Sequence, residues 1–388
     1  MLLGVPPASA LDWSRPWFEP RDSAAARERS DEYAWRLFIA LNWPADAVAR
    51  TADHRSRVGA DRPVVWETWR SAGDVYREDG ADPGPWGPGR RDEAVTAARR
   101  FETFSLRDFP NARHVVHGVM VPLVDPLVDA KRLTEIRLSR ATYQFIRTRE
   151  LYNVEGQLRA AAGAGSVTFP LGAKEVKAKW RPISDAERGR YHTLRVTFAD
   201  GTQRLYGLTA LHIASKDLPD WFWATFEHVD NASLPDGEGW RLPSHDDFAC
   251  RGTSADCNRA PGGVGLEGTV WQYYRLRGSL TRFVDAVGAP RRLANSELEA
   301  GFQSTASCIT CHSRASIGVG AAVDPAAPLR LPIFDGPART GFVGAPQAAW
   351  FASGGHGNPT FKPLDYVWSL SLAHAKTASS AGPGGSMR

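Results

Sequence analysis

The sequence predicts an α+β fold, in which a region of helices and antiparallel sheet precedes an all-α C-terminal lobe. Apolar and polar residues alternate along several segments between residues 113 and 229, which is the period of half-buried strands. Spacings of three and four residues, typical of amphipathic helices, occur before that stretch and return near residue 290. With 43% hydrophobic and 23% charged residues, the composition is that of a folded globular protein rather than a disordered one.

The chain divides into four expected segments. They are a surface tail over 1–30, an α+β domain with the antiparallel sheet over 31–285, an all-α domain over 290–376, and a disordered tail over 377–388. In the first tail, Ala8-Ser9-Ala10 follows a short apolar run and has the small-x-small form of a signal-peptidase site. We interpret it as the remnant of a secretory signal that begins upstream of Met1. The alternative is an ordinary apolar tail.

Two classes of partner are not expected. The net charge of +4 comes without a dense Lys/Arg block, so the sequence gives no reason to expect nucleic acid. No run of about 18 or more apolar residues is present, so no membrane span is predicted.

The α+β domain begins with a helix predicted over 31–40, because its apolar residues form one stripe and Asn42-Trp43-Pro44 ends it. A second short helix covers Trp66 and Trp69, and the Gly/Pro-rich segment 80–90 is predicted to be a loop. The segments 114–124 and 132–138 are predicted to pair as a hairpin, and a helix follows over 141–152.

The clearest strand covers 175–181. Val176, Ala178 and Trp180 alternate there with Glu175, Lys177, Lys179 and Arg181, so the two sets lie on opposite faces. Residues 194–198 and 205–213 form a second hairpin across Asp200-Gly201. A further strand over 221–229 is aromatic on both faces, which predicts that it is buried.

Four cysteines are present, in two pairs. Cys250 and Cys257 lie in a polar, loop-rich segment over 236–268, where a disulfide is expected if the compartment is oxidising. The alternative is two unpaired thiols. Cys308 and Cys311 belong to a different motif.

The last segment returns to a helical pattern after a strand or helix around 270–276. Ser296 and Glu299 have the spacing of a capping box and predict a helix start. The segment 318–362 is rich in Gly, Pro and Ala and is predicted to be a long loop. Pro363 then opens a last helix, whose apolar side carries Leu364, Val367, Trp368 and Leu372.

Ser307-Cys308-Ile309-Thr310-Cys311-His312 contains the spacing C-x-x-C-H, which is typical of covalent haem attachment. Two thiols on one helical turn can reach both vinyl groups of a haem, and the adjacent His312 can bind the iron. The alternatives are a redox C-x-x-C pair and half of a zinc site. The zinc site lacks a second Cys or His pair nearby, and the redox pair lacks its usual βαβ setting. The sequence therefore predicts one covalent haem c.

The order helix, C-x-x-C-H, loop, final helix resembles class I cytochrome c, so the all-α domain is expected to be a cytochrome c-like haem lobe. That family takes a methionine as second iron ligand, whereas here Met387 lies in the tail and Met120 far upstream. The options are an open iron, a weak ligand such as water, or a second histidine. The candidate histidines are His356 and His374 from the lobe and His228, His212 and His117 from the sheet region.

Longer segments of the chain resemble a family of uncharacterised single-haem cytochrome c proteins of Gram-negative bacteria. The resemblance rests on 38–44, 66–69, 175–181, 211–213, 223–231, 307–315 and the final helix. It implies a periplasmic haem protein with an added N-terminal α+β region, and it implies no substrate.

Two functions remain open. The first is electron transfer between the haem and a redox partner protein. The second is a haem enzyme with an open iron site that acts on a peroxide, a nitrogen oxide or an organic substrate. A variant of the second has a lysine, Lys177 or Lys179, cross-linked to the haem, as in small cytochromes whose sheet precedes the motif. A haem-based gas sensor ranks last, because no output module is present.

Overall fold

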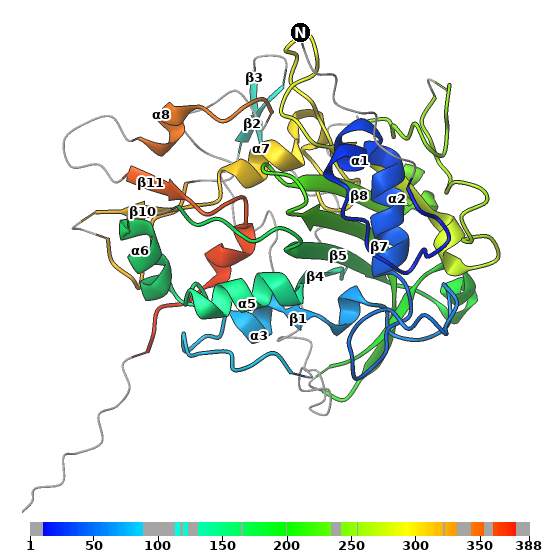
Figure 1. Ribbon diagram of the computed structural model, residues 1–388, viewed down its shortest axis with the longest axis horizontal. Coiled ribbons are helices and arrows are strands. Elements are labelled where there is room, and N and C mark those ends of the chain that lie inside the picture. Colours follow the sequence, from blue (N-terminus) through cyan, green and yellow to red (C-terminus); the bar gives the residue numbers. More distant parts are fainter. Residues whose placement is uncertain are drawn as a thin grey trace, which may run out of the picture.

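The computed structural model describes residues 11–87, 131–163, 166–198, 200–233, 242–253, 255–320, 323–331, 343–352 and 360–377, together with the backbone of 113–116 and 119–122. Among these residues the largest sheet has seven strands and is antiparallel, in the order β1-β4-β5-β7-β8-β9 with β6 beside β7 (Figure 1). The strands are β1 (Arg70–Ser71), β4 (Leu133–Leu138), β5 (Lys174–Pro182), β6 (Thr193–Thr197), β7 (Gln203–Ser215), β8 (Phe222–His228) and β9 (Tyr274–Leu280).

Several predicted elements are confirmed. The helix over 31–40 is α2 (Ser30–Leu41), and the helix over 141–152 is α5 (Arg140–Thr148). The strand over 175–181 is β5, and the second hairpin consists of β6 and β7. Every residue of β8 is buried, as its aromatic pattern predicts. Regular alternation and apolar stripes are local signals, so these elements could be predicted from short windows of sequence.

One face of the sheet is apolar and packs against α2, which crosses the strands in Figure 1. Trp35 and Phe38 of α2 lie 5.0 and 4.3 Å, between ring centroids, from Phe226 of β8. The apolar residues of β5 and β7 belong to the same core. Aromatic pairs at these separations add to the burial of their large surfaces, so this face is the main hydrophobic core of the N-terminal half.

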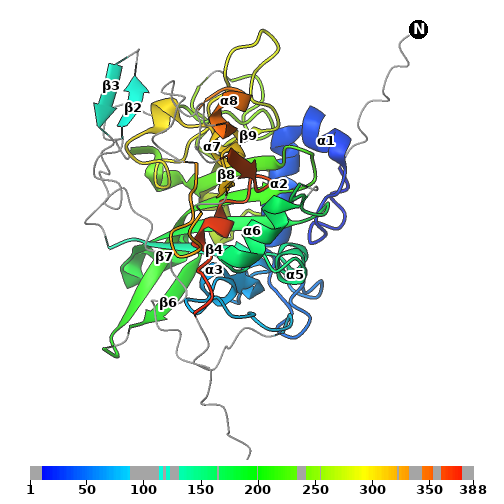
Figure 2. The same ribbon diagram turned by 90° about the vertical axis from the view of Figure 1, so that its left-hand side faces the viewer.

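The other face carries the polar residues of the same strands and is also covered. Lys177 of β5 pairs with His212 of β7, and Trp223 of β8 pairs with Ala214 of β7. Residues that pair directly across neighbouring strands share a face. Described residues from 293 to 373 pack against this side together with α3 (Ala72–Val75), α5 and α6 (Val154–Ala162). In both views the C-terminal segment, coloured orange to red, lies next to α6 (Figures 1 and 2).

The predicted all-α, cytochrome c-like C-terminal lobe is wrong. In the described part of 290–376 the helices are only α7 (Cys308–Ser313), α8 (Ala348–Phe351) and single 3₁₀ turns, and β10 (Ser316–Val319) pairs with β11 (Thr360–Pro363). Ile309, Ile317 and Leu370 pack in one cluster with Trp223 of the sheet. These apolar side chains are buried on the sheet, so they do not need a helical core of their own.

Two predicted helices within that segment do not form. At 296–302 the chain makes turns, because the backbone N–H of Ser296 donates to Glu227 of β8 and Oε1 of Glu299 lies 2.9 Å from Nε2 of His212 of β7. After Pro363, which ends β11, Asp365 and Tyr366 adopt left-handed backbone angles, and only the 3₁₀ helix Trp368–Leu372 follows. Long-range hydrogen bonds replace the helical ones in both places.

The first predicted hairpin has the wrong partners. Within this region β2 (Arg113–Val116) pairs antiparallel with β3 (Val119–Pro122) and not with the segment 132–138. β4 lies instead between β1 and β5. Alternation indicates that a segment is a strand but does not choose its partner.

The remaining described elements are short. They are α1 (Ser23–Glu28) and the 3₁₀ helices Trp66–Thr68, Asp185–Arg190, Val229–Ser233, Val270–Tyr273 and Gln303–Thr305. The longest described helix, α2, has 12 residues, and none of the described helices is long and apolar enough to span a bilayer.

Candidate functional site

A pocket lies between the polar face of the sheet and the C-terminal segment. It encloses about 1260 Å³ of space between atoms, part of which is open to solvent. The sheet contributes Thr134, Ile136, Glu175, Lys177, His212 and Trp223 to its lining. The C-terminal segment contributes Leu298, Glu299, Phe302, Cys308, Cys311, His312, Trp368 and Leu372.

The short helix α7 presents both cysteines of the C-x-x-C-H motif to this pocket. Cys308 and Cys311 are three positions apart, so they lie on the same side of one helical turn. Trp368 anchors the helix through its indole Nε1, which donates to the backbone oxygen of Cys311 at 2.7 Å. Both thiols are unpaired, and burial raises the pKa of Cys311 to about 11 and that of Cys308 well above its usual value. A redox C-x-x-C pair has a lowered thiol pKa, so this environment does not favour thiol–disulfide chemistry.

His312 is held in one tautomer by a backbone oxygen. Its Nδ1 lies 2.8 Å from the carbonyl oxygen of Tyr366, which only accepts hydrogen bonds, so Nδ1 carries the proton. The imidazole lines the pocket, and its centroid lies 4.4 Å from that of the Trp223 ring. Burial lowers the pKa of His312 to about 4. The imidazole is therefore neutral, with the lone pair of Nε2 free to bind a metal.

A second histidine, His212, lines the same pocket. Its Nε2 lies 2.9 Å from Oε1 of Glu299, and its Nδ1 is buried with no hydrogen-bond partner in the described part of the chain. The pKa of Glu299 is lowered on balance: burial acts to raise it, but His212, Lys177 and the backbone N–H of Asn295 together outweigh that effect. A histidine with one nitrogen on a carboxylate and the other unused has the arrangement of a metal-binding histidine.

The pocket also contains an acid with a raised pKa. Glu175 accepts a hydrogen bond from Ser369 Oγ at 2.7 Å, and burial raises the pKa of Glu175 to about 7. Lys177 lies two residues along the same strand and lines the pocket, whereas Lys179 does not.

Two of the other predicted iron ligands, His228 and His374, are not brought to the pocket. His228 is fully buried elsewhere, with its ring stacked on Tyr191 at 3.7 Å between centroids. Both of its nitrogens have backbone partners, Arg190 at 3.1 Å and Asp230 at 3.2 Å. His374 is exposed and does not line the pocket. His356 and His117 lie outside the described residues.

The second cysteine pair is separate from the pocket. Cys250 and Cys257 form a disulfide, and neither lines the pocket. Their loop is tied to its neighbours by backbone bonds from Cys250 to Asp246 and from Cys257 to Ser244.

In the part of the chain that the structure describes, no group of three or more His, Cys, Asp and Glu side chains could hold a metal ion. A haem iron takes four ligands from its porphyrin, so one histidine, or two, completes it. His312 and His212 both line the pocket, and Nδ1 of His212 is buried without a hydrogen-bond partner among the described residues.

Glu299, Glu175, Trp223 and Tyr366 are site residues that were not predicted from the sequence. Glu299 has the spacing of a helix cap, and Glu175 lies on a strand face that resembles a solvent face. The sequence signal that was available is the alternating polar set Glu175 and Lys177 on the predicted strand over 175–181. Comparison with family models, with curated proteins and with solved structures gives no match for this chain.

Proposed function

We propose that this protein is a single-haem c-type cytochrome that transfers electrons. The haem would be bonded to Cys308 and Cys311, with His312 as an iron ligand. The observation that carries the proposal is the placement of all three side chains in one pocket, with Nδ1 of His312 on the Tyr366 carbonyl and Nε2 unused. When bound there, a haem supplies a one-electron iron couple.

His212 is our candidate for the second iron ligand. Glu299 holds its Nε2, and its Nδ1 has no partner among the described residues. Two histidine ligands would leave no open position on the metal, which supports electron transfer over substrate turnover.

A haem-dependent oxidoreductase is the second candidate, and Glu175 favours it. A carboxyl group with a pKa of about 7 can both give and take a proton near neutral pH. In this reading His212 stays off the metal, and His212 and Glu175 exchange protons with a small substrate such as a peroxide or a nitrogen oxide.

We further propose that the protein works in the periplasm with a redox partner protein. The disulfide between Cys250 and Cys257 supports an oxidising compartment, as does the proposed covalent attachment.

Covalent attachment is the first test. The chain, produced together with a bacterial c-type maturation system, is expected to keep its colour after acid–acetone extraction and to give the pyridine haemochrome spectrum of haem c. Cys308→Ser combined with Cys311→Ser is expected to lose that covalent colour. Cys250→Ser combined with Cys257→Ser is the matched control and is expected to keep it. A colourless matured chain, or equal loss in both double variants, rejects the proposal.

The spin state separates the two candidate roles. For an electron carrier, the oxidised protein is expected to be low-spin, and His212→Ala is expected to convert it to high-spin. A wild-type protein that is already high-spin and that binds cyanide supports the oxidoreductase instead. Absorption and electron paramagnetic resonance spectra make both measurements.

A further inference from the structure

The carbonyl that holds His312 belongs to a short segment with an uncommon backbone. Asp365 and Tyr366 have φ angles of 50° and 69°, so two consecutive residues with side chains lie in the left-handed region. Such residues persist only where their surroundings hold them in place, and they are concentrated at functional sites.

Asp365 is held by two strong contacts. Its Oδ1 lies 2.6 Å from Nζ of Lys216, and its Oδ2 accepts a hydrogen bond of 2.7 Å from the backbone N–H of Phe169. The side chains of Lys216 and Asp365 are only 6% and 8% exposed, so solvent screens the pair little.

Tyr366 is held at both ends. Its phenol donates to Oδ1 of Asp220 at 2.9 Å, and its backbone oxygen accepts from Nδ1 of His312 at 2.8 Å. Lys216 and Asp220 both lie in the turn between β7 and β8. One turn of the sheet therefore grips both left-handed residues.

We infer that the Lys216–Asp365 ion pair positions His312. By fixing Asp365, the ion pair fixes the direction of the Tyr366 carbonyl, and this carbonyl fixes the tautomer and orientation of the imidazole. We call this series of contacts, from Lys216 through Asp365 and Tyr366 to His312, the clamp. Lys216 and Asp365 are positioning residues. The consequence for an iron ligand rests on the proposed function, whereas the effect on the tautomer does not.

A buried ion pair is weak evidence for stability, because the loss of hydration offsets much of the attraction between the charges. Such pairs are retained in some proteins because they specify one arrangement. Here the arrangement specified is a carbonyl pointing at the pocket histidine.

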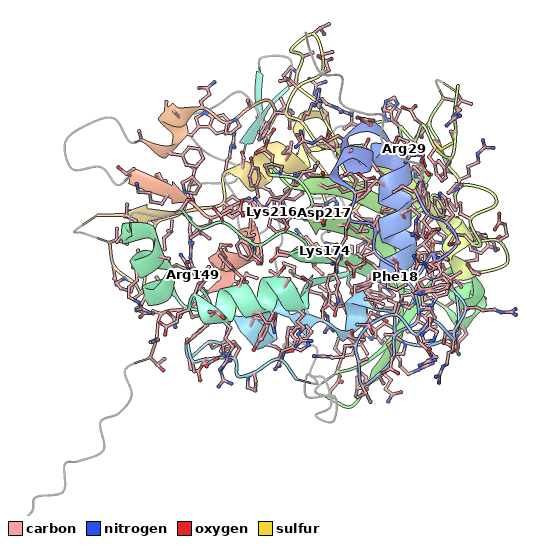
Figure 3. All side chains as sticks on the ribbon, viewed as in Figure 1. Phe18, Arg29, Arg149, Lys174, Lys216 and Asp217 are labelled. Carbon is pink, nitrogen blue, oxygen red and sulfur yellow. A yellow bond between two sulfur atoms is a disulfide. The ribbon has the colours of Figure 1, made fainter. Side chains whose placement is uncertain are left out.

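The structure contains a matched control. Lys174 is also buried and lies at the end of β5 beside Ser215, close to Lys216 (Figure 3). Its Nζ lies 3.0 Å from Glu19 and 3.8 Å from Asp217. Neither partner belongs to the left-handed segment, so losing Lys174 removes a similar buried charge without touching Asp365.

The direct test uses the full-length chain made without haem and labelled with ¹⁵N-histidine. In wild type the His312 signal, assigned by its loss in His312→Gln, is expected to show the proton on Nδ1 only. Asp365→Asn and Lys216→Met are each expected to give a mixture of tautomers, and Lys174→Met is expected to match wild type. Lys216→Arg keeps the charge and is expected to restore most of the Nδ1–H form.

A second measurement uses the matured protein. The hydrogen bond from Nδ1 makes the imidazole a more basic ligand, which favours the oxidised metal. Loss of the clamp is therefore expected to shift the midpoint potential of Asp365→Asn and Lys216→Met to more positive values, with no shift for Lys174→Met.

The outcomes separate this inference from the proposed function. An unchanged tautomer in folded Lys216→Met rejects the clamp, even if the chain carries haem. Equal changes in Lys174→Met and Lys216→Met reject it as well, because they indicate general loosening. If the tautomer changes in Lys216→Met but the matured wild-type chain never acquires haem, the clamp is supported and the proposed cytochrome function is rejected. If Asp365→Asn does not fold, Lys216→Met and Lys216→Arg decide.

Discussion

The two faces of the central sheet come from the same strands but are covered in different ways. On β5, Ala178 and Trp180 pack into the aromatic core under α2, while Glu175 and Lys177 line the pocket. The apolar face is covered by apolar side chains. The polar face is covered by a segment that supplies hydrogen bonds, such as those from Asn295 and Ser296. A polar strand face is therefore not always a solvent face.

The polar face differs from the apolar face most clearly in that it contains buried charged side chains. Glu227 and Arg275 pair across β8 and β9, and both side chains are fully buried. Ser296 donates to the same carboxylate from its backbone and its hydroxyl. Charges removed from water need partners of this kind, because an unpaired buried charge is strongly destabilising.

The largest effect is expected from breaking that pair. Arg275→Met leaves the Glu227 carboxylate buried with fewer partners and is expected to lower the free energy of unfolding by about 3–5 kcal/mol. Urea denaturation measures this loss. Arg159→Gln, which removes a half-exposed ion pair with Glu150, is the control and is expected to cost less than about 1 kcal/mol. If the two variants lose equal free energy of unfolding, the Arg275–Glu227 pair behaves like an ion pair in contact with water.

Truncation on the apolar face is expected to cost a similar or smaller amount of stability and to spare the pocket. Leu211 of β7 is fully buried in the core under α2 and does not line the pocket. Leu211→Ala is expected to lose about 2–5 kcal/mol of stability, through lost burial and the cavity that remains. Haem attachment, measured in the matured variant, is expected to stay at the wild-type level. Loss of attachment in a folded Leu211→Ala protein would mean that the two faces are coupled.

Because of Glu175, we expect the polar face to make the free energy of unfolding depend on pH, whereas the apolar side chains of the other face do not titrate. Its pKa is raised from 4.5 to about 7, so the folded chain keeps a proton that the unfolded chain loses between these values. Its contribution to stability is therefore complete below pH 4.5 and falls as the pH rises through about 7. In the haem-free chain, Glu175→Gln is expected to gain on the order of 3 kcal/mol relative to wild type above pH 7. Unfolding curves that differ equally at every pH would contradict this.

Local patterns in the sequence predicted a good part of the fold. The alternation along β5 assigned Val176 and Lys177 to opposite faces, and the same reasoning assigned β6, β7 and β8. The pattern at Ser296 and Glu299 misled, because a capping spacing also occurs where both residues bond to distant strands. The final helix failed for the same reason: Asp365 and Tyr366 bond to the β7–β8 turn rather than to their own helix.

The sequence by itself determined that two thiols and an imidazole lie close together, because C-x-x-C-H spacing needs only one turn of helix to gather them. Only the tertiary structure decided what faces them. His212 meets Glu299 across 87 positions, and His312 meets the Tyr366 carbonyl across 54. Contacts over such separations depend on how the whole chain packs, and no periodicity within a short window records them.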